Sequence, residues 1–429
     1  MVVILFVVVL FILLASRIHI AVGLGMTGII LLLIYHGIPM QVINQSVFKS
    51  VDSYPLAAIP FFILLGEGIQ KGKLAPYVMD LINLFLRRFR GGLAVATILT
   101  SVFFAAVSGS SVASAAALGR NVTDILEEEK YPKRFAAGLV AVGATLGIMI
   151  PPSLSFIIIG TMVGLPIVTL FTAGILPGLV EATGLAIVAY YLSRKNQWGI
   201  VAKENISIAA VGRLTGRASP ILFTPFLILG GIYLGWFTPT EVAAVAAGYC
   251  LFIGFFLYRS LSVRDVGSSL KGALYSSGMI YFIIIGGNLL AFMLTRLGVT
   301  QMMVEAVQKA GLQPWQFLLI VNIILLGLGC VLDGISICIL SIPILFPMAK
   351  AVGVDLIHFS VVMTANIEIA TLTPPIGLNL FVMSGVTGLP VHEVVRGVTP
   401  FFAMRFFMLM VITYVPWLSL ILPSLGGYM

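Results

Sequence analysis

The sequence has 429 residues, of which 60% are apolar and only 9% are charged, and its formal net charge is +8. Soluble domains have roughly 25% charged residues, so this composition excludes a cytosolic enzyme, a nucleic-acid-binding module and a coiled coil. Apolar runs of about 18 residues or more, long enough to cross a lipid bilayer, recur along the chain. The sequence therefore predicts an all-α polytopic membrane protein, whose excess of Lys and Arg reports topology rather than a nucleic-acid partner.

The N-terminal segment is apolar up to its first basic residue, Arg17. A cleavable signal peptide carries its positive charge before the apolar stretch, so we expect a retained span with the N-terminus outside. Farther along, the three cysteines lack a CxxC spacing and the four histidines are scattered singly. We therefore expect neither a disulfide framework nor a zinc or other transition-metal site.

Two basic loops determine the predicted topology. Segments 194–217 and 259–271 are rich in Lys and Arg and are separated by two predicted spans, 218–236 and 240–258. Basic loops gather on the cytoplasmic face, and an even number of crossings places both loops there. Extending this count places both termini outside. The basic residues left away from the cytoplasm are Lys49, Arg296, Lys309 and Lys350 outside and Arg405 within a span.

This topology requires two segments, 92–119 and 314–349, to enter and leave the membrane on the same side. Each is an apolar stretch with a polar interruption, at Ser110-Ser111 in the first and at Asp333-Gly334 in the second. Irregular backbone at membrane depth is tolerated only where it is buried in protein or lines a cavity. We therefore predict two re-entrant helical hairpins.

The chain also contains an internal repeat, with an offset of about 223 residues. Pro151-Pro152 recurs as Pro374-Pro375, and the two hairpin interruptions fall on each other at the same offset. The predicted units are N-terminal spans at 1–54, a first repeat at 55–193, basic loops with two linking spans at 194–272, and a second repeat at 273–425.

Each repeat has the same order of parts: a span, an amphipathic helix at the membrane interface, a hairpin, a helix broken at Pro-Pro, and a final span. The broken helices are expected at 135–164 and 356–387. By the charge-based topology, segment 55–70 runs inward and segment 273–295 runs outward, so the two repeats are inverted. Inverted repeats with broken helices are typical of secondary transporters, which bind their cargo between the repeats.

The two Pro-Pro pairs predict cation sites. Proline lacks an N–H donor and frees carbonyls on the preceding turn, and carbonyl and hydroxyl oxygens suit a small hard cation such as Na⁺. Carboxylate and histidine relays for protons are few, which favours sodium as the coupling ion. The alternative, that Ser and Thr only cap helix ends beside a structural kink, stays open. The predicted sodium ligands are Ser108, Ser110, Ser111, Gly143, Gly147 and Pro151 in the first repeat and Asp333, Gly334, Thr371 and Thr373 in the second.

Asp333 is the preferred acidic candidate, because burying an ionisable group at membrane depth is expensive unless something pairs with it. Glu368 is a second candidate, and the alternative that Arg405 simply neutralises it in a structural ion pair stays open. Glu181 and Glu241 are interpreted as helix-end or interhelical residues.

The half-helices that follow the Pro-Pro pairs indicate the class of substrate. Their N-termini direct partial positive charge toward the membrane midplane, which favours a carboxylate ligand. The predicted substrate-binding residues are Ser111, Ser153, Gly377 and Asn379.

A resemblance to a known family rests on the stretches SGSSVASAAALG, GATLGIMIPPS and TLTPPIGLNLF. They resemble the large membrane subunit of tripartite ATP-independent periplasmic (TRAP) transporters, and the resemblance extends over essentially the whole chain. It implies an elevator-type, Na⁺-coupled importer of an organic acid in the bacterial inner membrane. Sialic acid (N-acetylneuraminate) is the first candidate substrate and C4-dicarboxylates are the second. The implied partners are a separate small membrane subunit of four spans and a periplasmic substrate-binding protein.

The resemblance also implies that the hairpin serines and segment 143–151 form one sodium site, and that Asp333, Gly334, Thr371 and Thr373 form the other. One departure is that Ile376-Gly377 follows the second Pro-Pro pair where Ser153-Leu154 follows the first, so a hydroxyl role is not copied between the halves.

Three alternatives belong to other classes or mechanisms. One is a stand-alone cation-coupled carboxylate carrier that needs no binding protein, and another is a non-transporting scaffold. A membrane-embedded hydrolase is disfavoured, because no histidine is expected to face the serine-rich segment 108–114. We therefore expect a transporter rather than an enzyme.

Overall fold

The computed structural model describes residues 20–36, 39–201 and 207–427. Within these residues all regular structure is helical. Six helical segments are long and apolar enough to cross a membrane, or up to seven if the bent pair Gln41–Val51 and Tyr54–Lys71 is one span. The predicted class, an all-α polytopic membrane protein, is confirmed. The expected first span and Arg17 lie outside the described residues.

The helices of the first half are α2 (Ile20–His36), α3 (Met40–Val51), η1 (Tyr54–Ala57), α4 (Ala58–Lys71), α5 (Ala75–Leu86), α6 (Gly92–Ser108), α7 (Ser111–Glu128), α8 (Lys133–Met149), α9 (Leu154–Val163) and α10 (Ile167–Lys195). Those of the second half are α11 (Ile208–Tyr233), α12 (Pro239–Phe252), η2 (Ile253–Leu257), α13 (Val263–Arg296), α14 (Val299–Lys309), α15 (Pro314–Gly329), α16 (Gly334–Val352), α17 (Leu356–Ala370), α18 (Leu378–Thr387), α19 (Val391–Tyr414) and α20 (Trp417–Leu425).

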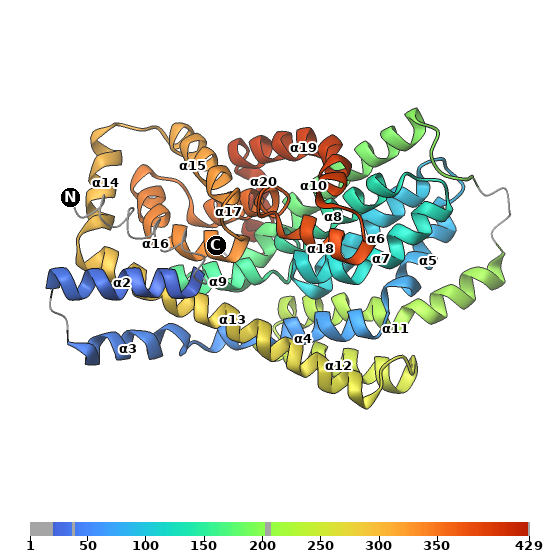
Figure 1. Cartoon of the computed structure of the whole chain (residues 1–429), viewed down its shortest axis with the longest axis horizontal. Helices are drawn as coiled ribbons and strands as arrows, with labels where there is room; N and C mark the ends of the chain where they lie inside the picture. The colour runs from blue at the N-terminus through green and yellow to red at the C-terminus, as the bar shows by residue number, and fades with distance from the viewer. Residues whose placement is uncertain (1–19, 37–38, 202–206, 428–429) are drawn as a thin grey trace.

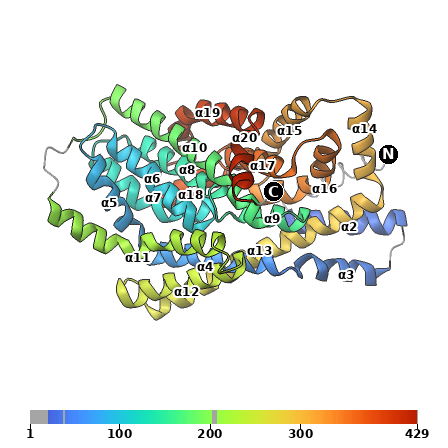
Figure 2. The ribbon, with the colours of Figure 1, turned by 180° about the vertical axis from the view of Figure 1, so that it is seen from behind.

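The helices form two layers. In Figures 1 and 2, α3, α4, α11, α12 and α13 run along one long side of the molecule, and the hairpins and broken helices of both repeats lie along the other. We call these the frame layer and the core layer. Helix α5 packs against α6 and α11, and α14 packs against α13 and α16, so each joins the two layers. The long helix α13 crosses the whole contact between them.

The internal repeat is confirmed helix by helix. Helices α6 to α10 correspond in order to α15 to α19, with first residues displaced by 222 residues between Gly92 and Pro314 and by 224 between Ile167 and Val391. Both Pro-Pro bonds, at Pro151-Pro152 and Pro374-Pro375, are cis. The predicted architecture of two inverted repeats, each with a re-entrant hairpin and a broken helix, is therefore the fold of this chain.

Two helices begin earlier than the sequence suggested. Helix α11 begins at Ile208 rather than near residue 218, so Arg213 and Arg217 lie in the helix and not in a loop. Helix α13 begins at Val263 rather than near residue 273, so Arg264 and Lys271 lie in its first turns and not in a loop. The reason is a capping box, in which the Ser262 and Asp265 side chains each bond the other residue's backbone N–H.

Two glycines allow α8 and α19 to cross closely near their N-terminal ends. A Cβ atom on Gly138 would lie 2.1 Å from the carbonyl carbon of Gly397, and one on Gly397 would lie 1.9 Å from the Arg134 carbonyl oxygen. Real Cβ atoms do not approach backbone atoms this closely, so a methyl group at either position would push the two helices apart.

We expect Gly397→Ala to lower the free energy of unfolding by about 1–3 kcal/mol, because the added methyl overpacks a backbone contact. The measurement is thermal unfolding of the purified protein in detergent. Gly385→Ala, on α18, is the matched control, because its methyl group would have no other heavy atom within 4 Å and should not destabilise the protein. Equal stability of the two variants would show that this crossing is looser than described.

Candidate functional site

Four helices begin at one small cavity in the core layer. Its volume is about 80 Å³, and its lining includes Ser111, Leu154, Gly334 and Leu378, which are the first residues of α7, α9, α16 and α18. We call it the tip cavity, because the tips of both hairpins meet there. Helix N-termini carry partial positive charge and unpaired N–H groups. The four helix ends at the cavity therefore favour an anion.

At the first hairpin tip the backbone turns sharply between α6 and α7. Gly109 has φ +62°, and its carbonyl oxygen accepts a hydrogen bond from the Leu154 N–H at 3.3 Å. A Cβ atom on Gly109 would lie 2.5 Å from the Pro152 carbonyl oxygen, so a side chain would block this contact. Ser110 Oγ accepts from the Ala113 N–H at 3.3 Å and caps α7. The first tip is thus attached directly to the first helix break.

At the second tip, Asp333 caps α16. Its carboxylate accepts hydrogen bonds from the N–H groups of Ile335 at 3.1 Å and Ser336 at 3.2 Å, and also from the Ser336 hydroxyl. A Cβ atom on Gly334 would lie 2.4 Å from Ile367 Cγ2, which brings this tip against α17. Asp333 therefore places a negative charge at the tip cavity while it satisfies donors of its own helix.

The predicted sodium residues fall into two groups. Those that line the tip cavity are Ser110, Ser111, Asp333, Gly334 and Thr371. The other group does not line this cavity and includes Ser108 and Thr373. Ser108 Oγ bonds Ser114 Oγ at 2.8 Å, and Thr373 Oγ1 donates to the Ile369 carbonyl at 2.8 Å.

The glycines of the first predicted sodium segment have different neighbours. A Cβ atom on Gly147 would lie 3.2 Å from the Ser110 carbonyl group, so this glycine is at the first tip. A Cβ atom on Gly143 would lie 2.5 Å from Ser101 Oγ, so Gly143 packs against α6 instead. Pro151 is in the break itself, in the cis bond to Pro152.

The other three predicted substrate residues, Ser153, Gly377 and Asn379, lie at the helix breaks and not in the lining of the tip cavity. Ser153 is fully buried, and its hydroxyl donates to the Ile148 carbonyl. Asn379 Nδ2 donates to the Ala141 carbonyl at 3.2 Å, which links α18 to α8. The Gly377 N–H donates to the Thr373 carbonyl at 3.0 Å. Each of these residues shapes a break, and none of the three lines the tip cavity.

A larger cavity of about 620 Å³ separates the tips from the frame layer. Ser110 and Asp333 line it on the core side, and Glu67, Gln70 and Tyr275 line it on the frame side. We call it the tip–frame cavity. Sequence reasoning missed its frame residues, although the polar pattern GEGIQK within the apolar helix α4 was an available signal. The tips therefore face a space large enough for a small organic anion.

A buried ion triad joins four helices behind the tips. Arg405 Nη1 donates to Glu368 Oε2 at 2.7 Å and to Glu181 Oε2 at 2.8 Å, and all three side chains are at most 2% exposed. Arg405 Nη2 donates to the Val142 carbonyl at 3.1 Å and also to the Thr145 hydroxyl. The ion pair between Glu368 and Arg405 is confirmed, and Glu181 is an interhelical residue as interpreted. Glu241, in turn, is a helix-end residue in the capping box of α12.

Comparison with known proteins gives a consistent result. A family model described as Tripartite ATP-independent periplasmic transporter, DctM component, matches residues 7–418. The C4-dicarboxylate TRAP transporter large permease protein DctM of Pseudomonas aeruginosa is 37% identical over 405 residues, 94% of each chain. The sialic acid TRAP transporter large permease protein SiaM of Vibrio cholerae is 32% identical over 381 residues, 89% of each chain. The solved YdaH transporter of Alcanivorax borkumensis has a similar fold, with a TM-score of 0.58 at 12% identity over 91% of this chain and 89% of its own.

We expect Arg405→Met to lower the free energy of unfolding by about 3–5 kcal/mol, because it leaves two buried carboxylates without their cation. Thermal unfolding in detergent measures this effect. Arg396→Met, on the same helix in an exposed pair with Glu393, is the matched control and should change stability little. A wild-type melting curve for Arg405→Met would contradict a structural role for the triad.

Proposed function

Because the chain belongs to the DctM component family of tripartite ATP-independent periplasmic transporters, we propose that it is the large transport subunit of a system that imports an organic acid together with Na⁺. The observation that carries this proposal is the meeting of four helix N-termini at the tip cavity. An enzyme would need a nucleophile and a base at such a site, whereas a carrier needs only charge complementarity and access.

The ends of the helices differ in a way that suits a carboxylate. Ser110 and Asp333 cap α7 and α16 with their side chains, but α9 and α18 have no side-chain cap. The N–H groups of Leu154 in α9 and of Asn379 and Leu380 in α18 donate to carbonyl groups of the chain, and the other N–H groups at these two ends can donate to a substrate carboxylate, which supplies two oxygens. We therefore assign the substrate to the tip cavity and the tip–frame cavity, with its carboxylate toward the N-termini of α9 and α18.

We assign sodium to the C-terminal ends of the helices that lead into the tips and the breaks. Helix α6 packs against α8, and α15 packs against α17. Near the first tip, a Cβ atom on Gly147, close to the end of α8, would lie 3.2 Å from the Ser110 carbonyl group. At the second pair, a Cβ atom on Gly329 would lie 2.6 Å from Ala370 Cβ, which places the two ends in contact. Carbonyl ends carry partial negative charge and suit a small hard cation. Asp333 and Thr371 add side-chain oxygens to the second site.

The substrate proposal is a small organic acid. The relatives in the comparisons are named for C4-dicarboxylate and sialic acid transport, at 37% and 32% identity. These identities favour a C4-dicarboxylate as the first substrate to test, ahead of the sialic acid expected from the sequence. We further propose the two partners of a tripartite system, a small membrane subunit of four spans and a periplasmic substrate-binding protein, with this chain in the bacterial inner membrane and both termini on the periplasmic side.

The test is uptake into proteoliposomes that contain this chain and its small membrane subunit. We expect succinate or sialic acid to accumulate only when an inward sodium gradient and the loaded binding protein are both present. Dissipating the sodium gradient should reduce uptake to the level of empty liposomes. Uptake that needs no binding protein would support the stand-alone carrier instead, and uptake that ignores sodium would refute the coupling ion.

We expect Asp333→Asn to raise the sodium concentration for half-maximal uptake at least about tenfold, because it removes the negative charge from the second cation site. Asparagine still caps a helix, so the fold should be retained. Asp355→Asn is the matched control, because exposed Asp355 caps α17 through two backbone N–H groups at 2.8 and 2.9 Å. Wild-type sodium dependence in Asp333→Asn would reduce Asp333 to a helix cap.

A further inference from the structure

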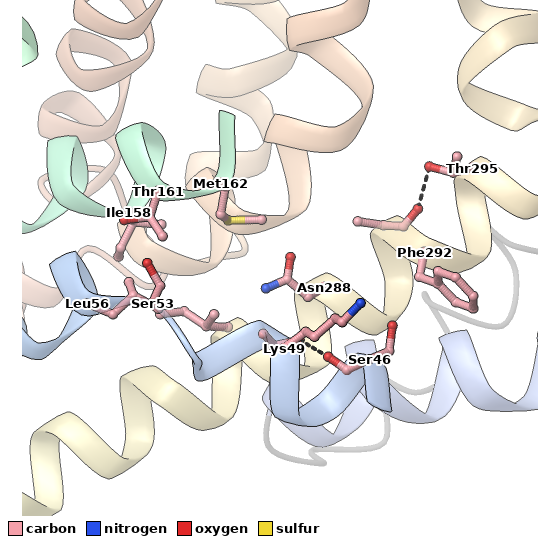
Figure 3. Close-up of a pocket in the computed structure, with 13 residues that line it drawn as sticks. Ser46, Lys49, Ser53, Leu56, Ile158, Thr161, Met162, Asn288, Phe292 and Thr295 are labelled. Atoms are coloured by element: carbon pink, nitrogen blue, oxygen red, sulfur yellow. Dashed lines mark hydrogen bonds between the residues drawn. The ribbon is translucent and has the colours of Figure 1, made fainter. Parts of the chain in front are cut away.

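A second polar cavity lies elsewhere between the frame and core layers. It has a volume of about 410 Å³ and is lined by α3, η1 and α13 on the frame side and by the end of α9 on the core side. Figure 3 shows the nitrogen atoms of Lys49 and Asn288 in the space between these helices. We call it the Lys49 cavity. None of its lining residues lines the tip cavity or the tip–frame cavity.

The Lys49 cavity carries positive charge without a counter-charge. Among the described residues, no carboxylate lies within 4.0 Å of the Lys49 ammonium group, and no acidic residue lines the cavity. Arg296 does not line the cavity, but its guanidinium lies 5.2 Å from the ring centroid of Phe292, which does. A cation in a cleft with low-dielectric walls attracts anions from solution more strongly than one on an open surface.

The other polar groups of the cavity match an oxygen-rich ligand. Thr161 Oγ1 is buried and has no hydrogen-bond partner within the described chain. Asn288 contributes an amide, which donates and accepts. By contrast, the hydroxyls of Ser50 and Thr295 already donate to their own helices, at 2.6 and 2.9 Å. Lys49 and Asn288 therefore present donors from two helices to one space, and the unpartnered Thr161 Oγ1 is buried in its wall.

The position of this cavity relates it to the substrate site. Helix α13 lines both large cavities, with Ile283 in the tip–frame cavity and Ile284 in the Lys49 cavity, so the two follow each other along one helix. Helix α9 does the same on the core side, from Leu154 at the tip cavity to Thr161 in the Lys49 cavity, a rise of about 10 Å. The charge-based topology puts Lys49 outside.

We propose that the Lys49 cavity is an outer docking site for the carboxylate of the substrate. Lys49 and Asn288 receive the anion there before it reaches the helix N-termini at the tip cavity. This inference rests on the proposed function for the identity of the ligand. The electrostatic part concerns only this chain, because it follows from an unpaired lysine in a polar cavity that no acidic residue lines.

The first experiment probes the potential of the cavity without transport. Thr295→Cys lines the cavity and is introduced in a Cys330→Ser background, then labelled with anionic sulfonatoethyl or cationic trimethylammonium-ethyl methanethiosulfonate. We expect the ratio of the anionic to the cationic labelling rate at Thr295→Cys to be raised about tenfold. We expect Lys49→Gln to remove most of this preference. Met302→Cys, exposed on α14 and outside the cavity, is the control, and its labelling ratio should not respond to Lys49→Gln. An unchanged ratio at Thr295→Cys would overturn the proposal.

The second experiment measures succinate uptake with the complete system. We expect Lys49→Gln to raise the half-saturating concentration at least about fivefold at low ionic strength, with the maximal rate within about twofold of wild type. Lys49→Arg should restore the wild-type value, and Lys309→Gln, which removes an exposed charge elsewhere on the same predicted face, should have no effect. If wild type transports and Lys49→Gln matches it, this inference is wrong. If wild type transports nothing while the labelling preference holds, the proposed function is wrong and the anion site stands.

Discussion

The organisation of this protein depends on one constraint, which is that no backbone polar group can be left unpaired inside a bilayer. Two hairpin tips and two Pro-Pro breaks create eight helix ends at membrane depth, and each end has orphan N–H or carbonyl groups. The core layer brings these ends together instead of exposing them to lipid. Some are satisfied within the chain, as when the Gly109 carbonyl accepts from the Leu154 N–H. The four N-terminal ends line the tip cavity, where a ligand or water can reach them.

This sorting of helix ends also gives a physical reason for coupling an anion to a cation. N-terminal ends face the tip cavity, and C-terminal ends pair behind it in α6 with α8 and in α15 with α17. An anion bound at the N-termini lowers the cost of placing cations at the adjacent carbonyl ends, and the cations do the same for the anion. In the proposed function, reciprocal stabilisation of this kind would link the substrate to sodium through the helix ends.

The repeat explains the location of the ion triad. Thr145 and Glu368 occupy corresponding positions at an offset of 223, and Glu181 and Arg405 correspond at an offset of 224. Each repeat thus supplies one member of each pair, and the two repeats meet at this cluster. The same position of the repeat carries Glu181 in one copy and Arg405 in the other, so the contact between the copies joins opposite charges. Three hydrogen bonds of the Arg405 side chain to the first repeat, at Glu181, Val142 and Thr145, strengthen this junction.

Much of the fold was predictable from the sequence because its signals are local. Gly, Ser and Pro-Pro interrupt apolar helices at fixed points, and the offset of about 223 residues transfers each interruption to the other repeat. The start of α13 was missed because a short capping box outweighs the basic charge that suggested a loop. The site was predicted less completely. Gly143 packs on Ser101, and the frame residues Glu67 and Tyr275 face the tips, because such relations depend on how helices pack rather than on their order.

The two large cavities differ in charge, and this difference suits one direction of movement. The Lys49 cavity is lined by a lysine and by no acidic residue, whereas the tip–frame cavity is lined by the carboxylates of Glu67 and Asp333. Glu67 is partly neutralised by Lys71 at 3.5 Å, so its repulsion of an anion is moderate and screened by solvent. An organic anion is therefore attracted on the Lys49 side and held less strongly on the Glu67 side, while α13 forms the wall common to both. In the proposed function, sodium would hold the anion at the tips rather than select the side from which it arrives.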